Sequence, residues 1–138
     1  MTFNDLFGSG KPLIGVLHLL PLPGAPLYGG NIQRVYDQAL SELDVFRQHR
    51  LDSVIVENFR DMPYYPGRVP AETVAALAAI SRDIVKAAQM PVGINVLRSD
   101  GEAAVWLQAL DLVPDVAAPP LPASRPDGAA ATPSAPRR

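Results

Sequence analysis

The sequence predicts an α/β fold made of three units, each a parallel strand followed by a helix. Short apolar runs occupy residues 13–17, 53–56 and 92–97, and a segment with helical periodicity follows each run. Near-continuous apolar runs are typical of strands covered on both faces, as in parallel sheets. Each run ends in polar residues, and folds of this class carry their functional groups at the carboxyl ends of the strands.

Composition and charge limit the classes of function. The chain has 138 residues, 48% of them hydrophobic, which suffices for one domain with a core. The net charge is −2 and the basic residues are scattered, so nucleic acid is not expected as a partner, because phosphate binding requires clustered Lys and Arg. The chain has no cysteine, which excludes disulfides, thiolate nucleophiles and cysteine-ligated metals.

The N-terminal segment shows no targeting signal. Residues 1–11 lack the basic and long apolar regions of a secretory signal. The longest apolar run, residues 12–22, is interrupted by His18 and Pro21 and is about half of the ~20 residues that cross a membrane. We therefore expect a soluble, cytoplasmic protein with no transmembrane segment.

The first predicted unit consists of the strand at 13–17 and a helix after it. His18 ends the strand, and the dense Pro and Gly of the next segment exclude helix and sheet there. Asn31 is the predicted helix cap, and the helix should end near His49 or Arg50. Apolar residues recur along this helix at steps of three and four and predict one buried stripe: Val35, Ala39, Leu43 and Phe46.

The second and third units repeat this pattern. After the strand at 53–56, a helix begins at Pro70, since proline is tolerated in a first turn. Its predicted buried stripe is Val74, Leu77, Ile80, Ile84 and Ala88. The third strand, 92–97, is followed by Asp100, a predicted cap for a helix that reaches about residue 112.

The chain divides into a folded part, 1–112, and a tail, 113–138, that is predicted to be disordered. Residues 117–138 contain six prolines and seven alanines, with no aromatic residue, so they cannot form a core. GC-rich DNA translated in an unintended frame yields this composition, which gives the hypothesis of a frameshift after about codon 110. Three units leave two unpaired sheet edges, from which we expect self-association and poor stability of the chain alone.

Three motifs resemble the BtpA family in their order and approximate spacing. They are KPLIGVLHLLPLPGAPLYGG at 11–30, VIVENFRDMPYYPGRVPAETVAALAAI at 54–80 and PVGINVLRSDGEAA at 91–104. The resemblance implies a (βα)8, TIM-type barrel related to phosphate-binding barrels, of which this chain holds the N-terminal part. For cyanobacterial members it implies a role in the biogenesis or stability of photosystem I reaction-centre proteins, as peripheral proteins at the thylakoid. Similar proteins also occur in organisms without photosynthesis, and an enzyme activity on a small molecule is often suspected from the fold.

His18 and Glu57 are the candidate catalytic residues. At the end of the first strand, His18 is placed to act as an acid, a base or a metal ligand, or to bond a backbone carbonyl. Side chains alternate in a strand, so either Glu57 or Asn58 faces the barrel interior and the other faces the helices. We favour Glu57, which needs a cation, metal or substrate there, or a structural ion pair with Arg98 or a neighbouring strand.

The candidate ligand-binding residues follow the second and third strands. Asp61 either belongs to the same site or caps its loop, and Asn95 either contacts a ligand or bonds within the sheet. Arg98 is a candidate anion clamp, whereas Asp100 is equally a helix cap. The full ligand-binding set is Asn58, Asp61, Asn95, Arg98 and Asp100. A nearby loop either closes over a ligand or packs on its neighbour: Tyr64, Tyr65, Gly67 and Arg68.

Two functions are consistent with these residues. In the first, the chain is a truncated BtpA-like barrel with the assembly role of its family. In the second, it belongs to an enzyme barrel acting on a small metabolite, phosphorylated or not, with no metal set or cofactor motif to specify the chemistry. The common phosphate site of such barrels follows strands seven and eight, so this chain is not expected to be catalytically competent.

Overall fold

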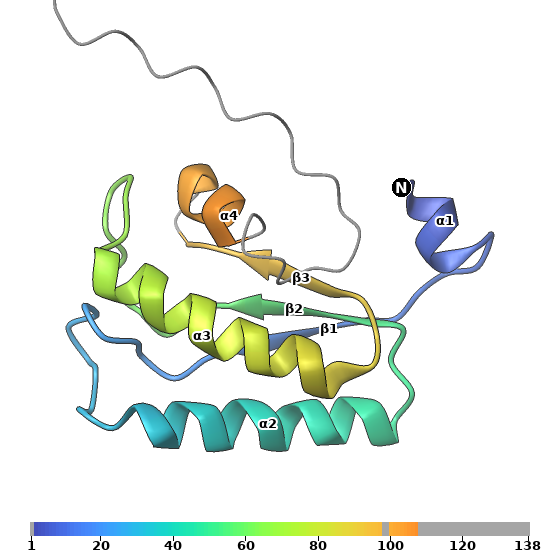
Figure 1. Cartoon of the computed structure of the whole chain (residues 1–138), viewed down its shortest axis with the longest axis horizontal. Coiled ribbons are helices and arrows are strands. Elements are labelled where there is room, and N and C mark those ends of the chain that lie inside the picture. The colour runs from blue at the N-terminus through green and yellow to red at the C-terminus, as the bar shows by residue number, and fades with distance from the viewer. Residues whose placement is uncertain (1, 98–99, 108–138) are drawn as a thin grey trace, which may run out of the picture.

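Three parallel strands, adjacent in chain order, form one sheet (Figure 1). The computed structural model describes residues 2–97 and 100–107. The elements are α1 (Phe3–Phe7), β1 (Ile14–His18), α2 (Ile32–Gln48), β2 (Ser53–Glu57), α3 (Ala71–Ala88), β3 (Val92–Asn95) and α4 (Gly101–Leu107). The predicted α/β fold with three βα units is confirmed. The predicted tail, 113–138, lies outside the described residues.

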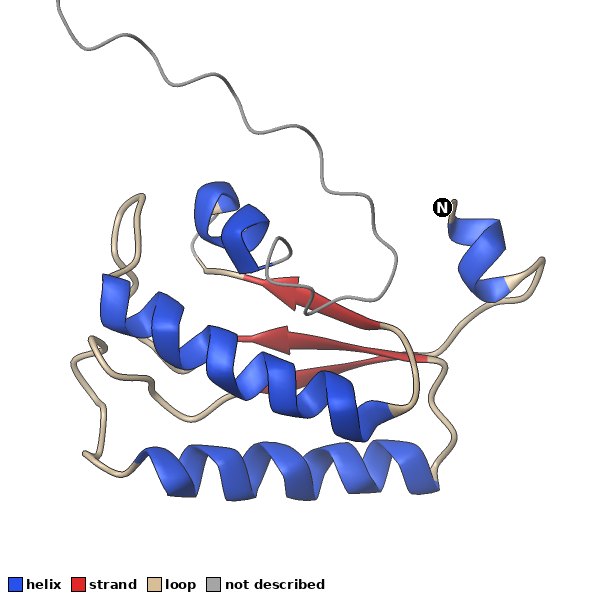
Figure 2. Cartoon of the chain, viewed as in Figure 1, coloured by secondary structure: helices blue, strands red, loops and turns tan. Residues whose placement is uncertain are grey.

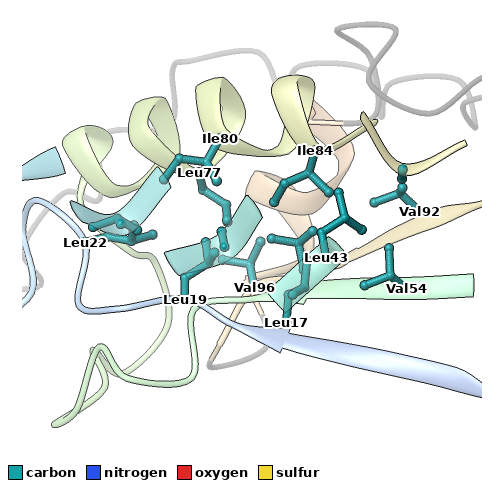
Figure 3. Close-up of a cluster of buried hydrophobic side chains, with 14 of the residues drawn as sticks. Leu17, Leu19, Leu22, Leu43, Val54, Leu77, Ile80, Ile84, Val92 and Val96 are labelled. Carbon is teal, nitrogen blue, oxygen red and sulfur yellow. The ribbon is translucent and has the colours of Figure 1, made fainter. Parts of the chain in front are cut away.

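Helices α2 and α3 cover one face of the sheet, as Figure 2 shows. Leu17, Val54 and Val56 point to this face and are fully buried. They meet apolar side chains of the two helices, and this cluster is the hydrophobic core (Figure 3). Burial of each large side chain is worth roughly 1.5–3 kcal/mol, so this face holds the sheet and helices together.

The first unit follows the sequence prediction closely. The Asn31 side chain accepts a hydrogen bond from the Arg34 backbone N–H at 3.2 Å and caps α2. The helix ends at Gln48, with His49 as its cap. A side chain at Gly15 would lie 2.6 Å from the Leu51 side chain, so only glycine lets this part of the chain approach β1.

Helix α3 is turned slightly relative to the prediction. Pro70 precedes the helix instead of lying in its first turn, and Val74 is only half-buried. Thr73 is buried in its place, because its hydroxyl donates to the Pro23 carbonyl at 2.7 Å. A Cβ at Gly24 would lie 2.6 Å from that hydroxyl, and the backbone φ of +92° also favours glycine there. The other four predicted residues, Leu77, Ile80, Ile84 and Ala88, are buried as expected, so the difference is confined to the first turn of α3.

The opposite face of the sheet carries neither α2 nor α3. Ile14 and Val16 point to this open face, and each is 39% exposed. Within the described residues, β1 pairs only with β2, and β3 also pairs only with β2, so each outer strand has a free edge. Further strands of a larger sheet would add at these two edges.

The short helix α1 was not predicted from the sequence. A capping box forms it, in which the Asp5 N–H bonds the Thr2 side chain and the Thr2 N–H bonds the Asp5 carboxylate. It lies beyond the amino ends of the strands (Figure 1), and Phe3 is 55% exposed. No helix within residues 2–97 and 100–107 is long and apolar enough to cross a membrane.

Candidate functional site

One row of polar side chains crosses the carboxyl end of the open sheet face. The register pairs His18 of β1 with Glu57 of β2, and Glu57 with Asn95 of β3. Residues in register on neighbouring strands point to the same face, so the three side chains lie next to one another. We call His18, Glu57 and Asn95 the rim row. The structure therefore brings together three of the residues that the sequence singled out.

Glu57 is the centre of the rim row. The Asn95 side-chain amide donates to Glu57 Oε1 at 2.5 Å, and His18 Nε2 lies 3.3 Å from Glu57 Oε2. The Glu57 side chain is 14% exposed, whereas that of His18 is 40% exposed. The carboxylate is thus held between two neighbouring strands while the imidazole faces solvent, which agrees with the predicted pairing of Glu57 to a neighbouring strand.

Phe59 fixes the plane of the His18 ring. The two rings are stacked, with centroids 4.3 Å apart and planes 18° apart. Phe59 was not among the predicted site residues, although a signal was present. It lies only two positions after Glu57, in the turn that follows β2, so its nearness to the strand end was that signal.

Asn58 and Asp61 point away from the rim row. Asn58 has no exposed surface, and it bonds the Leu97 backbone twice, accepting from N–H at 2.7 Å and donating to C=O at 3.1 Å. Its amide also donates to Asp61 Oδ2 at 3.0 Å, while Asp61 Oδ1 accepts from the Leu22 N–H at 2.8 Å. We call this set of contacts the loop clasp. The predicted alternation is confirmed: Glu57 faces the open side and Asn58 the helix side.

Burial raises the pKa of Asp61 above its ordinary value. The hydrogen bonds from the Leu22 backbone and the Asn58 side chain lower that pKa and offset part of the effect. The cavity beside the loop clasp measures about 10 Å³, which is room for about one water molecule. Both polar atoms of the Asn58 side chain have protein partners. The ligand-binding role predicted for Asn58 and Asp61 stays a prediction.

Asp100 takes the helix-cap role that was the alternative for it. It is buried, Oδ1 accepts from the Ala103 N–H at 3.0 Å, and Oδ2 accepts from the Val69 N–H at 2.9 Å. It therefore joins the start of α4 to the loop before α3. Arg98, the predicted anion clamp, lies outside the described residues.

The loop at 64–68 packs on neighbouring loops in this structure. The Tyr65 hydroxyl donates to the Gly24 carbonyl at 3.0 Å, and the Tyr64 hydroxyl donates to the Phe59 carbonyl at 2.6 Å. Arg68 forms an exposed ion pair with Glu102. The loop was expected either to close over a ligand or to pack on its neighbour, and these contacts are those of packing on a neighbour.

The described residues contain no cluster of three or more histidine, aspartate or glutamate side chains that could hold a metal ion. The chemistry that the rim row itself offers is proton transfer through an imidazole held by a carboxylate. The row lies at the carboxyl ends of parallel strands, and in α/β barrels catalytic residues come from the ends of several such strands.

Comparison with protein families identifies the class more closely. Residues 9–111 match the BtpA family. The chain belongs to the BtpA family, which confirms the resemblance seen in the three sequence motifs. No solved structure matches the chain significantly.

Relatives of the chain come from archaea, bacteria and an animal. An uncharacterised protein of Pyrococcus abyssi is 44% identical over 92 residues, which cover 67% of this chain and 35% of that protein. The photosystem I biogenesis protein BtpA of Synechocystis is 40% identical over 105 residues, covering 76% and 37%. An uncharacterised mitochondrial protein of Caenorhabditis elegans is 32% identical over 87 residues, covering 62% and 31%. The chain thus spans about a third of the length of these relatives.

Proposed function

We propose that the rim row is part of a small-molecule site of BtpA-family proteins, and that this chain supplies an N-terminal arc of a TIM-type barrel that contains it. The carrying observation is the register, which places one polar side chain from each strand around Glu57 on the open face. Helices α2 and α3 pack on the other face, and the side chains of His18 and Asn95 are exposed, so a ligand can reach them. In α/β barrels this end of the strands carries the chemistry.

Proton transfer is the reaction type that these groups support. His18 is the more exposed group of the pair, and an imidazole both accepts and donates protons near neutral pH. The fold alone does not choose the substrate. The loops after strands seven and eight, where such barrels bind phosphate, would lie in the two thirds of the relatives that this chain does not match. We therefore propose that turnover belongs to full-length members, and that this chain binds ligand without turning it over.

Ligand binding is testable on the chain itself, because it has only two histidines, His18 and His49. The imidazole signals would be followed by NMR while sugar phosphates and their unphosphorylated counterparts are added one at a time. We expect at least one compound to shift the His18 signals and to leave those of His49 unchanged. The His49→Ala variant, altered at the exposed end of α2, should retain the response, and His18→Ala should abolish binding. Equal shifts at both histidines, or none at His18, would contradict the proposal.

A second function rests on the Synechocystis relative, whose name assigns it to photosystem I biogenesis. We propose it only for a photosynthetic host, where this chain would act in the cytoplasm and at the thylakoid surface. Deletion of the gene in such a host should lower photosystem I content, and the wild-type gene should restore it. Unchanged photosystem I content after deletion, or a host without photosynthesis, would exclude this role.

We also propose that the chain self-associates through its free sheet edges and open face. Ile14 and Val16 are part-exposed there, and β1 and β3 each lack a second strand within the described part of the chain. The sedimentation coefficient should rise with concentration, and Val16→Lys, which places a charge on the open face, should reduce that rise. A coefficient that stays that of a monomer at all concentrations would count against this proposal.

A further inference from the structure

We propose that Asn95, Glu57 and Phe59 are positioning residues that hold one tautomer of His18, with the proton on Nε2 and with Nδ1 left to exchange a proton with the ligand. This inference deepens the proposed function and rests on it for the role of Nδ1. It changes the role of Glu57, which the sequence analysis treated as a catalytic residue. The structure assigns the proton transfer to His18 alone.

Glu57 is occupied by protein groups at both carboxylate oxygens. Asn95 donates to Oε1 at 2.5 Å, and His18 Nε2 lies 3.3 Å from Oε2. A carboxylate held on both sides by neighbouring strands, with its side chain 14% exposed, offers little to a ligand. Its effect on a reaction must therefore pass through the imidazole that it contacts.

The contact with Glu57 determines which nitrogen of His18 carries the proton. A neutral imidazole has one N–H donor and one lone pair. An unprotonated Nε2 would set its lone pair against a carboxylate oxygen, so the favourable neutral form is Nε2–H with the lone pair on Nδ1. Within residues 2–97 and 100–107, Nε2 is the ring nitrogen that lies against Glu57, at 3.3 Å in an ion pair, and Nδ1 has no such contact. Stacking on Phe59 at 4.3 Å opposes the ring flip that would exchange the two nitrogens.

His49 provides an internal reference with the opposite tautomer. Its Nδ1 lies 2.9 Å from the Val45 carbonyl oxygen, which can only accept, so in neutral His49 the proton is on Nδ1. His49 follows the C-terminal end of α2, away from the rim row. Because the chain has no third histidine, the two tautomers can be read in one spectrum.

The test is long-range ¹H–¹⁵N correlation NMR of the full chain without ligand, in alkaline solution where free imidazole is neutral. We expect the Nε2–H pattern for His18 and the Nδ1–H pattern for His49. In Glu57→Gln, the orientation that keeps the Asn95 hydrogen bond turns the new amide oxygen to Asn95 and its NH₂ to His18. That NH₂ donates to Nε2, so His18 should change to the Nδ1–H tautomer while His49 stays unchanged.

Asn95→Ala in the Glu57→Gln background sharpens the test. Without Asn95 the new amide is free to rotate, and His18 should show a mixture of both tautomers. An Nδ1–H pattern for His18 in the wild-type chain, or a tautomer that Glu57→Gln leaves unchanged, would overturn the inference. The wild-type spectrum alone shows whether His18 carries its proton on Nε2, even if a variant fails to fold. If the expected tautomers are found but no added compound shifts the His18 signals, the proposed ligand site is refuted. The inference that Glu57 positions His18 would then still stand.

Discussion

Glu57 and Asn58 are neighbours in the chain, yet they belong to two regions with different physical character. In the rim row, Glu57 meets other side chains at the edge of solvent. In the loop clasp, Asn58 has no exposure and meets mainly backbone groups of the chain after β3. The comparison shows that a polar residue at a strand end is not by itself a site residue, because the partners of its polar atoms decide its role.

The two regions should respond differently to mutation. A buried polar group whose partner is removed costs its full desolvation free energy, whereas water can replace a partner at a part-exposed site. Changes in the loop clasp should therefore lower stability, and changes in the rim row should alter binding and His18 while stability changes little.

The largest effect is expected from Asn58→Ala. The variant leaves the Leu97 N–H and C=O without their partner and removes a donor from Asp61. We expect a loss of about 2–4 kcal/mol in the free energy of unfolding, because several buried groups lose partners at once. Urea denaturation would measure it, with Asn4→Ala on the exposed helix α1 as the control. A loss no larger than that of the control would remove the distinction between the two regions.

A smaller effect, with a characteristic pH dependence, is expected from Asp61→Asn. Burial raises the folded-state pKa of Asp61 above the ordinary value of 3.8, so the native state binds the proton more tightly than the unfolded state. Asp61 therefore makes its full contribution to the free energy of unfolding below pH 3.8. This contribution falls as pH rises through the raised folded-state pKa. Acidification into that window should raise the stability of the wild type relative to the variant in urea titrations. A difference that moves the other way, or stays constant, would contradict this assignment.

Asp100→Ala should cost about 1 kcal/mol, the usual value for a lost helix cap, plus the cost of the unpartnered Val69 N–H. The measurement is again urea denaturation. Asp100→Asn is the matched variant: it keeps one acceptor oxygen and should restore part of the loss. Equal stability of Asp100→Ala and the wild type would show that this contact does not hold α4.

Asn95→Ala should change stability by less than about 1 kcal/mol, because Asn95 is exposed on an edge strand. The variant should nevertheless broaden or shift the His18 NMR signals, since Glu57 loses the donor at Oε1. A stability loss as large as that of Asn58→Ala would place Asn95 with the structural residues.

The smallest effect is expected from Arg68→Ala. The ion pair with Glu102 is exposed at both partners, and pairs of this kind contribute about 0–1 kcal/mol. Thermal denaturation at low and high salt should give nearly the same melting temperature for wild type and variant. A clearly lower melting temperature of the variant at low salt would show that this ion pair contributes more to stability than its exposure indicates.

Much of the fold was predictable because local patterns determine it. Apolar runs define the strands, and Asn31 defines the start of α2. Because the three strands are parallel, their last residues, His18, Glu57 and Asn95, lie at the same end of the sheet. These features depend on residues close in sequence, or on a rule that applies to every parallel sheet.

The loop clasp could not be predicted, because its partners are far apart in the chain. Asp61 bonds Leu22, and Asn58 bonds Leu97, each across 39 positions. No periodic pattern marks such pairs, so the sequence could not show that both residues also hold loops together. Thr73 shows the same limitation, since the partner of its buried hydroxyl, the Pro23 carbonyl, lies 50 positions away.

The in-register pairing of the strands makes the rim row extendable. His18 and Asn95 each stand at an outer strand, so a fourth strand docked in the same register at either edge would insert its own side chain beside one of them. The imidazole and carboxylate already in place would keep their contacts. A longer sheet would therefore add residues beside His18 or Asn95 from its flanking strands, while the contacts of Glu57 with His18 and Asn95 would stay unchanged.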